Sequence, residues 1–115
     1  MTKIINYITK ETIIEDENLE TTKELVEKAV KEGISLQYAD LRLEALIGAD
    51  LRNSDLRNSD LIGSNLEGSD LRNCDLTDAD LEGAYLGGCK FHKDQLKDLL
   101  KGLKIKVMKK NNDNT

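Results

Sequence analysis

The sequence of 115 residues predicts a mainly β solenoid, a chain that winds into stacked coils. The first observation is a Leu or Phe at every fifth position from residue 41 to residue 91, without a gap. This period matches neither the 3.6 residues of a helix nor the 2.0 of a flat strand, so the chain is expected to turn a corner every five residues. The second is the absence of proline, which suits a fold that uses its backbone N–H groups in ladders.

All but one of the five-residue units have a small residue two places before the apolar centre, and most have an Asp or Asn one place before it. The small residue and the centre are two apart, so both point inward from an extended segment while the Asp points outward. The last two residues of the unit form the corner, where Gly, Asn and Ser are common. The centres are Leu41, Leu46, Leu51, Leu56, Leu61, Leu66, Leu71, Leu76, Leu81, Leu86 and Phe91.

The unit small-Asp-Leu-x-x resembles the pentapeptide-repeat family. The resemblance implies a right-handed quadrilateral β-helix with four units per coil, so residues 34–93 are expected to form about three coils. Glu44 departs from the pattern because it occupies an inward position, and we expect its carboxylate to reach solvent or a backbone donor. Phe91 is expected to close the end of the core.

Residues 1–33 are expected to form a hairpin and a cap helix, since a solenoid must cover its apolar ends. Two β-prone runs, residues 4–8 and 12–14, flank a polar turn. A capping box, with Thr21 as N-cap and Glu24 three residues later, precedes a short amphipathic stripe that stops at Gly33. This arrangement also resembles that of small bacterial and phage members of the family.

Residues 94–115 are expected to form a cap helix, an edge strand and a mobile polar tail. The helix is indicated by Leu96, Leu99, Leu100 and Leu103, which share one helical face. Apolar residues alternate with Lys over residues 103–107, as in an edge strand.

No residue pattern indicates an enzyme, a metal site or a cofactor. His92, the only histidine, has no Ser or Cys partner at a recognisable spacing, and Cys74 and Cys89 fall in inward small-residue positions. The Asp residues recur every five positions, unlike calcium-binding loops. The sequence has no transmembrane run and no signal-peptide core, so the cytoplasm is the expected location.

The charge is unevenly distributed: residues 34–91 carry a formal charge of −6 and residues 92–115 a charge of +4. An acidic body argues against direct nucleic-acid binding. Some family members mimic DNA and bind type II topoisomerases, so the resemblance raises the alternative of a gyrase inhibitor or protector. Its candidate acidic surface comprises Asp40, Asp60, Asp80, Glu82, Asp55, Asp75 and Asp78. Arg42 and Arg57 interrupt these faces, and three coils make a short rod for a mimic.

The preferred hypothesis is a non-catalytic protein-interaction or scaffold module that self-associates, with an unknown further protein partner. Four apolar side chains are expected to point outward on adjoining faces and form a candidate interaction surface: Leu43, Ile47, Ile62 and Tyr85. The hairpin and the strand over residues 103–107 are expected to be unpaired β elements whose edges join copies into a homo-oligomer. A monomer whose C-terminal strand folds back on its own last coil is the alternative.

Overall fold

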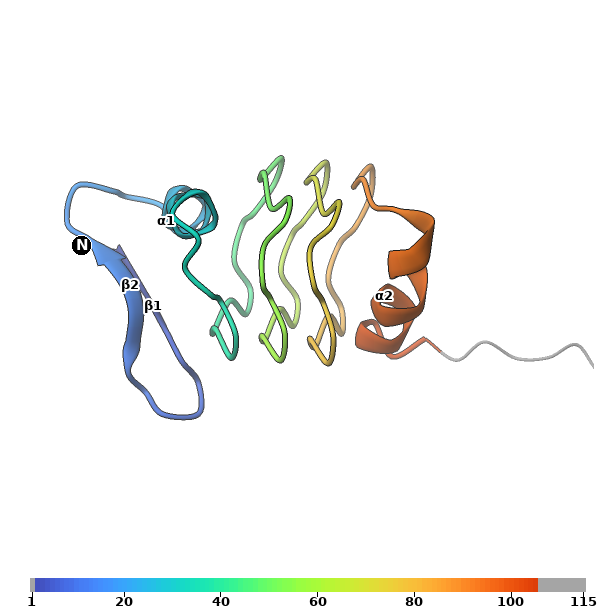
Figure 1. Ribbon diagram of the computed structural model, residues 1–115, viewed down its shortest axis with the longest axis horizontal. Helices are drawn as coiled ribbons and strands as arrows, with labels where there is room; N and C mark the ends of the chain where they lie inside the picture. Colours follow the sequence, from blue (N-terminus) through green and yellow to red (C-terminus); the bar gives the residue numbers. More distant parts are fainter. Residues whose placement is uncertain (1, 106–115) are drawn as a thin grey trace, which may run out of the picture.

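The computed structural model describes residues 2–105, which form a rod of stacked coils closed by a cap at each end (Figure 1). Strands β1 (Thr2–Ile5) and β2 (Thr12–Asp16) and helix α1 (Thr22–Lys31) make the N-terminal end. The short 3-10 helix η1 (Lys93–Gln95) and helix α2 (Leu96–Gly102) make the other. None of the helices within residues 2–105 has the length and apolar character that a membrane span requires.

Each five-residue unit ends in a β-turn that makes a corner of the coil. In a representative unit the N–H of Ser59 donates to the carbonyl of Leu56, 3.1 Å away, and Asn58 before it has a φ of 60°. A positive φ at the third position of a turn favours Gly and Asn, because neither resists the left-handed region strongly. Eight corners carry Gly or Asn there: Gly48, Asn53, Asn58, Gly63, Gly68, Asn73, Gly83 and Gly88.

Successive coils are joined by single-residue parallel bridges between positions 20 residues apart. One column of bridges runs through Asp40, Asp60 and Asp80, and three further columns lie on the other sides of the coil. The bonds are regular: the Leu41 N–H donates to the Asp60 carbonyl at 2.8 Å, for example. The spacing of 20 residues means four units per coil, as the family resemblance implies.

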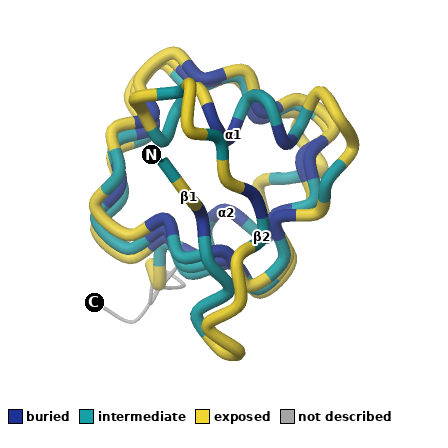
Figure 2. The backbone as a smooth tube through the Cα atoms, turned by 90° about the vertical axis from the view of Figure 1, so that its left-hand side faces the viewer, coloured by how far each residue is buried: buried dark blue, intermediate teal, exposed yellow. Residues whose placement is uncertain are grey.

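The apolar centres are mostly buried, while the exposed residues lie mainly at the corners of the coils (Figure 2). The centres from Leu41 to Leu71 and Leu81 are completely buried, and Leu76 is 2% exposed. Leu86 is only half-buried and Phe91 is 39% exposed, so the prediction that Phe91 closes the core is wrong. Leu99 of α2, which is 2% exposed, joins the core instead.

The N-terminal hairpin is hydrogen-bonded to the first coil, which corrects the expectation that it is an unpaired element. Asn6 forms an antiparallel bridge with Ala39, where the Asp40 N–H donates to the Ile5 carbonyl at 2.9 Å. The Tyr7 hydroxyl donates to the Asn58 carbonyl at 2.7 Å. The two strands of the hairpin thus continue the Asp40 column beyond the first coil.

Helix α1 covers the apolar end of the first coil beside the hairpin. Its buried residues Leu25, Val26 and Ala29 belong to the core. Thr21 caps its start, since the threonine hydroxyl accepts the Glu24 N–H at 3.1 Å and donates to the Glu24 carboxylate. This places α1 where the predicted cap helix was expected.

Helix α2 closes the opposite end by close backbone contact. The Leu81 N–H donates to the Gly102 carbonyl at 2.8 Å, and a Cβ at Gly102 would lie 2.8 Å from the Ala79 carbonyl oxygen, so glycine is required there. The strand expected over residues 103–107 does not begin as predicted, because Leu103 and Lys104 lie in a turn and Lys104 has a φ of 58°. Residues 106 and 107 of that strand, and the predicted tail, lie outside the described residues.

Candidate interaction surface

A shallow groove on the side of the rod next to the hairpin contains two of the four predicted outward apolar residues. Leu43 and Ile62 line it together with Lys3, Ile5 and other side chains, including half-buried Glu44. Leu43 is 80% exposed and lies across Gly63 of the next coil, where a Cβ would be only 2.6 Å from Leu43 Cδ2. Leu43 thus lies over the glycine below it, and most of its surface remains in solvent.

Leu43 occupies a corner position whose backbone conformation is unfavourable for leucine. Its φ is 59°, in the left-handed region where a Cβ crowds the following carbonyl. Most other corners place Gly or Asn at this position. A bulky apolar residue that is both strained and exposed contributes little to folding, so Leu43 remains a candidate contact residue.

The other two predicted residues do not join this groove. Ile47 and Tyr85 are 54% and 60% exposed on the next face of the rod. Tyr85 bridges Asn65, which bridges Ala45, so it lies two coils from the unit that contains Ile47. At the spacing of neighbouring strands this is about 10 Å along the rod. Of the four predicted residues, Leu43 and Ile62 therefore share a groove, while Ile47 and Tyr85 are separately exposed.

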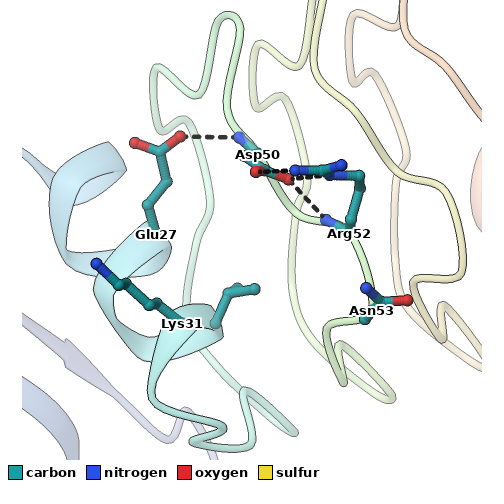
Figure 3. A pocket seen from close by; sticks show the side chains of 6 residues that line it. Glu27, Lys31, Asp50, Arg52 and Asn53 are labelled. Atoms are coloured by element: carbon teal, nitrogen blue, oxygen red, sulfur yellow. Dashed lines mark hydrogen bonds and ion pairs between the residues drawn. The ribbon is translucent and has the colours of Figure 1, made fainter.

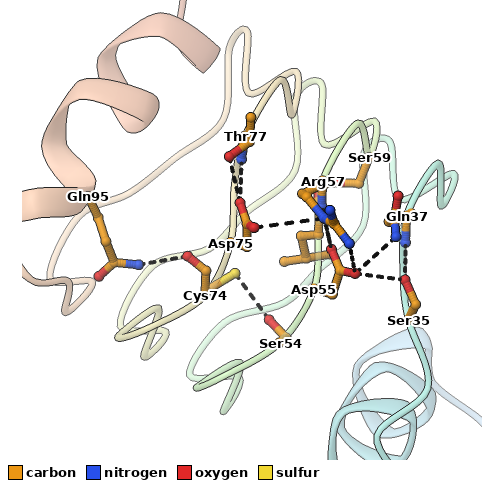
Figure 4. A network of polar contacts seen from close by, with 11 residues as sticks. Ser35, Gln37, Ser54, Asp55, Arg57, Ser59, Cys74, Asp75, Thr77 and Gln95 are labelled. Carbon is orange, nitrogen blue, oxygen red and sulfur yellow. Dashed lines mark hydrogen bonds and ion pairs between the residues drawn. The ribbon is translucent and has the colours of Figure 1, made fainter.

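The acidic face around Asp55 and Asp75 is held in a network of internal contacts (Figure 4). Asp55 accepts two hydrogen bonds of 2.9 Å from the Arg57 guanidinium and further bonds from Ser35 and Gln37. The bonds from Arg57, and to a smaller extent the bond from Ser35, lower the pKa of Asp55 to about 2. Asp75 accepts from the Thr77 hydroxyl at 2.6 Å and lies 3.7 Å from Arg57 Nε.

The remaining residues of the predicted acidic surface also have basic partners within the chain. The pairs are Asp40 and Asp60 with Arg42 at 3.7 and 3.4 Å, Asp78 with Lys101 at 2.9 Å, and Asp80 and Glu82 with Lys104 at 3.2 and 3.0 Å. Two of these partners come from the C-terminal end of the described chain. The basic C-terminal segment therefore neutralises part of the acidic body, a contact that sequence reasoning missed.

A second groove lies between α1 and the adjoining face of the solenoid (Figure 3). Here Glu27 Oε2 accepts the backbone N–H of Asp50 at 2.8 Å, while Asp50 accepts two bonds from the Arg52 guanidinium. The Asp50 N–H lies at the end of its column, and Glu27 supplies the acceptor that a preceding coil would have given. The groove is thus part of the N-terminal cap.

The two cysteines are buried or half-buried, and the histidine is exposed. Cys74 is 4% exposed, and its Sγ accepts a hydrogen bond from the Ser54 hydroxyl at 3.1 Å. Burial raises the pKa of the Cys74 thiol to about 12. Cys89 is half-buried, and burial raises its pKa also. His92 is exposed at the start of η1. Within residues 2–105 no three metal-ligating side chains are grouped closely enough to hold an ion.

A family model described as pentapeptide repeats matches the chain in eight copies, over residues 36–78 and 54–92. Those residues are the stacked coils of the structure. The chain belongs to the pentapeptide-repeat family. No curated protein sequence gives a significant match.

Solved pentapeptide-repeat structures resemble part of the chain. Rfr23 from the cyanobacterium Cyanothece 51142 is 40% identical, with a TM-score of 0.50, over 52% of this chain and 41% of its own. HetL, involved in heterocyst differentiation regulation in Nostoc sp. strain PCC 7120, is 31% identical with a TM-score of 0.31, over 50% and 32%. QnrB1, a plasmid-mediated fluoroquinolone resistance protein, is 25% identical with a TM-score of 0.29, over 65% and 45%. The matched segment spans less than half the length of each.

The recurring Asp of the pentapeptide repeat has a structural role at each corner of this protein. Its carboxylate Oδ1 accepts the backbone N–H two residues later, as between Asp60 and Ile62 at 3.1 Å and between Asp80 and Glu82 at 3.1 Å. Asn65 makes the same bond to the Glu67 N–H. This local side-chain bond stabilises the turn, so an acidic column follows from the fold and is weak support for DNA mimicry.

Proposed function

We propose that this pentapeptide-repeat protein is a non-catalytic protein-interaction module whose partner is a further copy of itself. The protein would be a right-handed rod of about three coils, as the family resemblance implies. The observation that carries the proposal is Leu43, an apolar side chain held at a strained corner and 80% exposed. With Ile62 it gives the side of the rod an apolar contact surface beside the hairpin.

A homotypic contact through this groove would bury apolar surface where the isolated chain leaves it in water. Burial of apolar surface stabilises a contact by about 25 cal/mol for each Å² removed from water. Covering Leu43 would therefore offset the free-energy cost of its backbone conformation. Lys3, Arg42, Asp40 and Glu44 also line the groove, so both signs of charge are present to pair across a self-complementary interface.

Light scattering across protein concentrations tests the proposal. The mass is expected to exceed the protomer mass of 12.9 kDa as concentration rises. Leu43→Asn should weaken this association while the chain stays folded. Ile8→Asn is the matched control, because Ile8 is 62% exposed on the hairpin turn, outside the groove. A protomer mass that persists to about 100 µM would remove the proposal.

The alternative of a DNA-mimic inhibitor of gyrase is less favoured by the electrostatics. All seven acidic residues of the candidate surface have a basic side chain within 4 Å inside the chain. A DNA mimic must instead present unneutralised negative charge to the cationic surface of its partner. These pairs would have to break, or be shared, on binding.

A further inference from the structure

The outer edge of β2 is open within residues 2–105. In the described chain β2 pairs only with β1, in an antiparallel register that sets Lys3 opposite Glu15. Ile5 and Tyr7 turn their peptide groups toward the first coil, where they bond Asp40 and Tyr38. By the alternation of an antiparallel ladder, Lys3 and Glu15 form a pair without mutual hydrogen bonds, so the peptide groups of Glu15 face outward.

This open edge ends a continuous hydrogen-bonded column that runs the length of the rod. The column passes from Asp80 through Asp60 and Asp40 to β1, and β2 is its last strand. The hairpin lies at the left-hand end of the rod in Figure 1 and faces the viewer in Figure 2. A further strand could therefore be added at this point without displacing any described element.

The opposite end of the same column is where the described chain leaves the rod. The Gly102 carbonyl accepts the Leu81 N–H, and Lys104 pairs with Asp80 and Glu82. The next residues are Lys106-Val107-Met108-Lys109-Lys110, which lie outside the described part of the chain. This segment has five residues, as β2 has, and consists of two adjacent apolar residues flanked by lysines.

The two ends carry opposite charges. Residues 11–17, which contain β2, have four acidic side chains and no basic one: Glu11, Glu15, Asp16 and Glu17. Asp16 is paired with Lys28 at 2.6 Å, and the other three have no ion pair within residues 2–105. Residues 104–110 have four lysines and no acidic side chain. Two β2 edges would bring like charges together and so repel each other, whereas the lysine segment would pair with the acidic edge.

A chain cannot place this segment on its own β2. Five ladder steps separate Gly102 from β2, about 24 Å along the rod. Covering that distance takes about seven extended residues. Residues 106–110 would be used in reaching β2 and could not pair with it.

We propose that residues 106–110 of one copy add as a strand to the outer edge of β2 in the next copy. The proposal rests on the self-association proposed above and names a contact distinct from the Leu43 groove. Backbone hydrogen bonds would continue the column of one rod into the next. Because this contact joins different surfaces, copies would assemble head to tail into open chains rather than closed dimers.

Sedimentation velocity on full-length variants tests the proposal by exchanging charges. Glu15→Lys on the β2 edge, and Lys106→Glu with Lys109→Glu in the C-terminal segment, should each lower the association constant at least tenfold. Mixing the two variants should restore assembly, because each then meets an end of opposite charge. The control is Glu67→Lys, a charge reversal at an exposed corner of the solenoid with no ion pair in the described chain. It should leave assembly unchanged.

The outcomes separate this contact from the proposed function. A wild-type protein that stays monomeric would overturn both proposals. Association that survives both charge variants but is lost in Leu43→Asn would overturn only the β2 contact. A mass that saturates at a dimer would also overturn it, since a head-to-tail contact leaves two free ends.

Discussion

Replacing Leu43 with Asn is expected to stabilise the fold, although Leu43 is the apolar residue that the interaction proposal depends on. Leu43 has a φ of 59°, and the corners at Asn53, Asn58 and Asn73 have nearly the same angle. A left-handed conformation costs an L-residue roughly 1–2 kcal/mol, and Asn tolerates it best after Gly. The substitution should therefore relieve strain at a position where the repeat otherwise uses Asn or Gly.

The packing that Leu43→Asn removes is small. Full burial of a leucine is worth about 1.5–3 kcal/mol, and Leu43 is 80% exposed, so roughly a fifth of that value is at risk. The net effect is a gain of about 1 kcal/mol, which should raise the melting temperature by about 4 °C in a chain of this size. Circular dichroism during thermal and urea unfolding measures both quantities.

The reverse substitution provides the control. Asn53→Leu places leucine at an exposed corner with a φ of 63°, and should cost about 1 kcal/mol. Loss of stability in Leu43→Asn, or an unchanged stability in Asn53→Leu, would show that the corner angle is not strained. The assignment of Leu43 to a surface role would then lose its physical basis.

Three further predictions follow from the caps and the charges. Gly102→Ala should lower the free energy of unfolding by about 1–3 kcal/mol, because the new Cβ meets the Ala79 carbonyl; Gly87→Ala, where a Cβ would lie 3.8 Å from Glu67, should be nearly neutral in the same urea titration. Arg57 lowers the pKa of Asp55 to about 2, so this pair stabilises the fold above about pH 4 and the stability is lost as pH falls toward 2. In Asp55→Asn the urea midpoint should depend less on pH between about pH 4 and pH 2. An unchanged pH dependence would refute the assignment of this stability to the Asp55–Arg57 pair. Supercoiling by gyrase should proceed uninhibited at about 100 µM protein, and inhibition that weakens with salt would instead favour DNA mimicry.

The repeat and most of its core could be predicted from the amino-acid sequence. Each unit repeats the same local rule, and each coil contacts only its neighbours, so the identity of one inward position predicts the next. Leu61 and Ser59 could be placed inside, and Asp60 outside, without reference to any distant residue. The caps were also predictable as elements, since Thr21 and the leucines of residues 96–103 carry local helix signals.

How the ends of the rod are capped and how the charges are paired depends on contacts between residues far apart in sequence. Asn6 pairs with Ala39, Glu27 accepts the Asp50 N–H, and Lys104 reaches Asp80; none of these contacts repeats along the chain. Phe91 matches the repeat but is exposed, because Leu99 rather than another coil closes that end. A periodic pattern specifies the contacts between one coil and the next. The last coil instead contacts a helix, which has a different geometry. Which residues fit there depends on the packing of segments far apart in sequence.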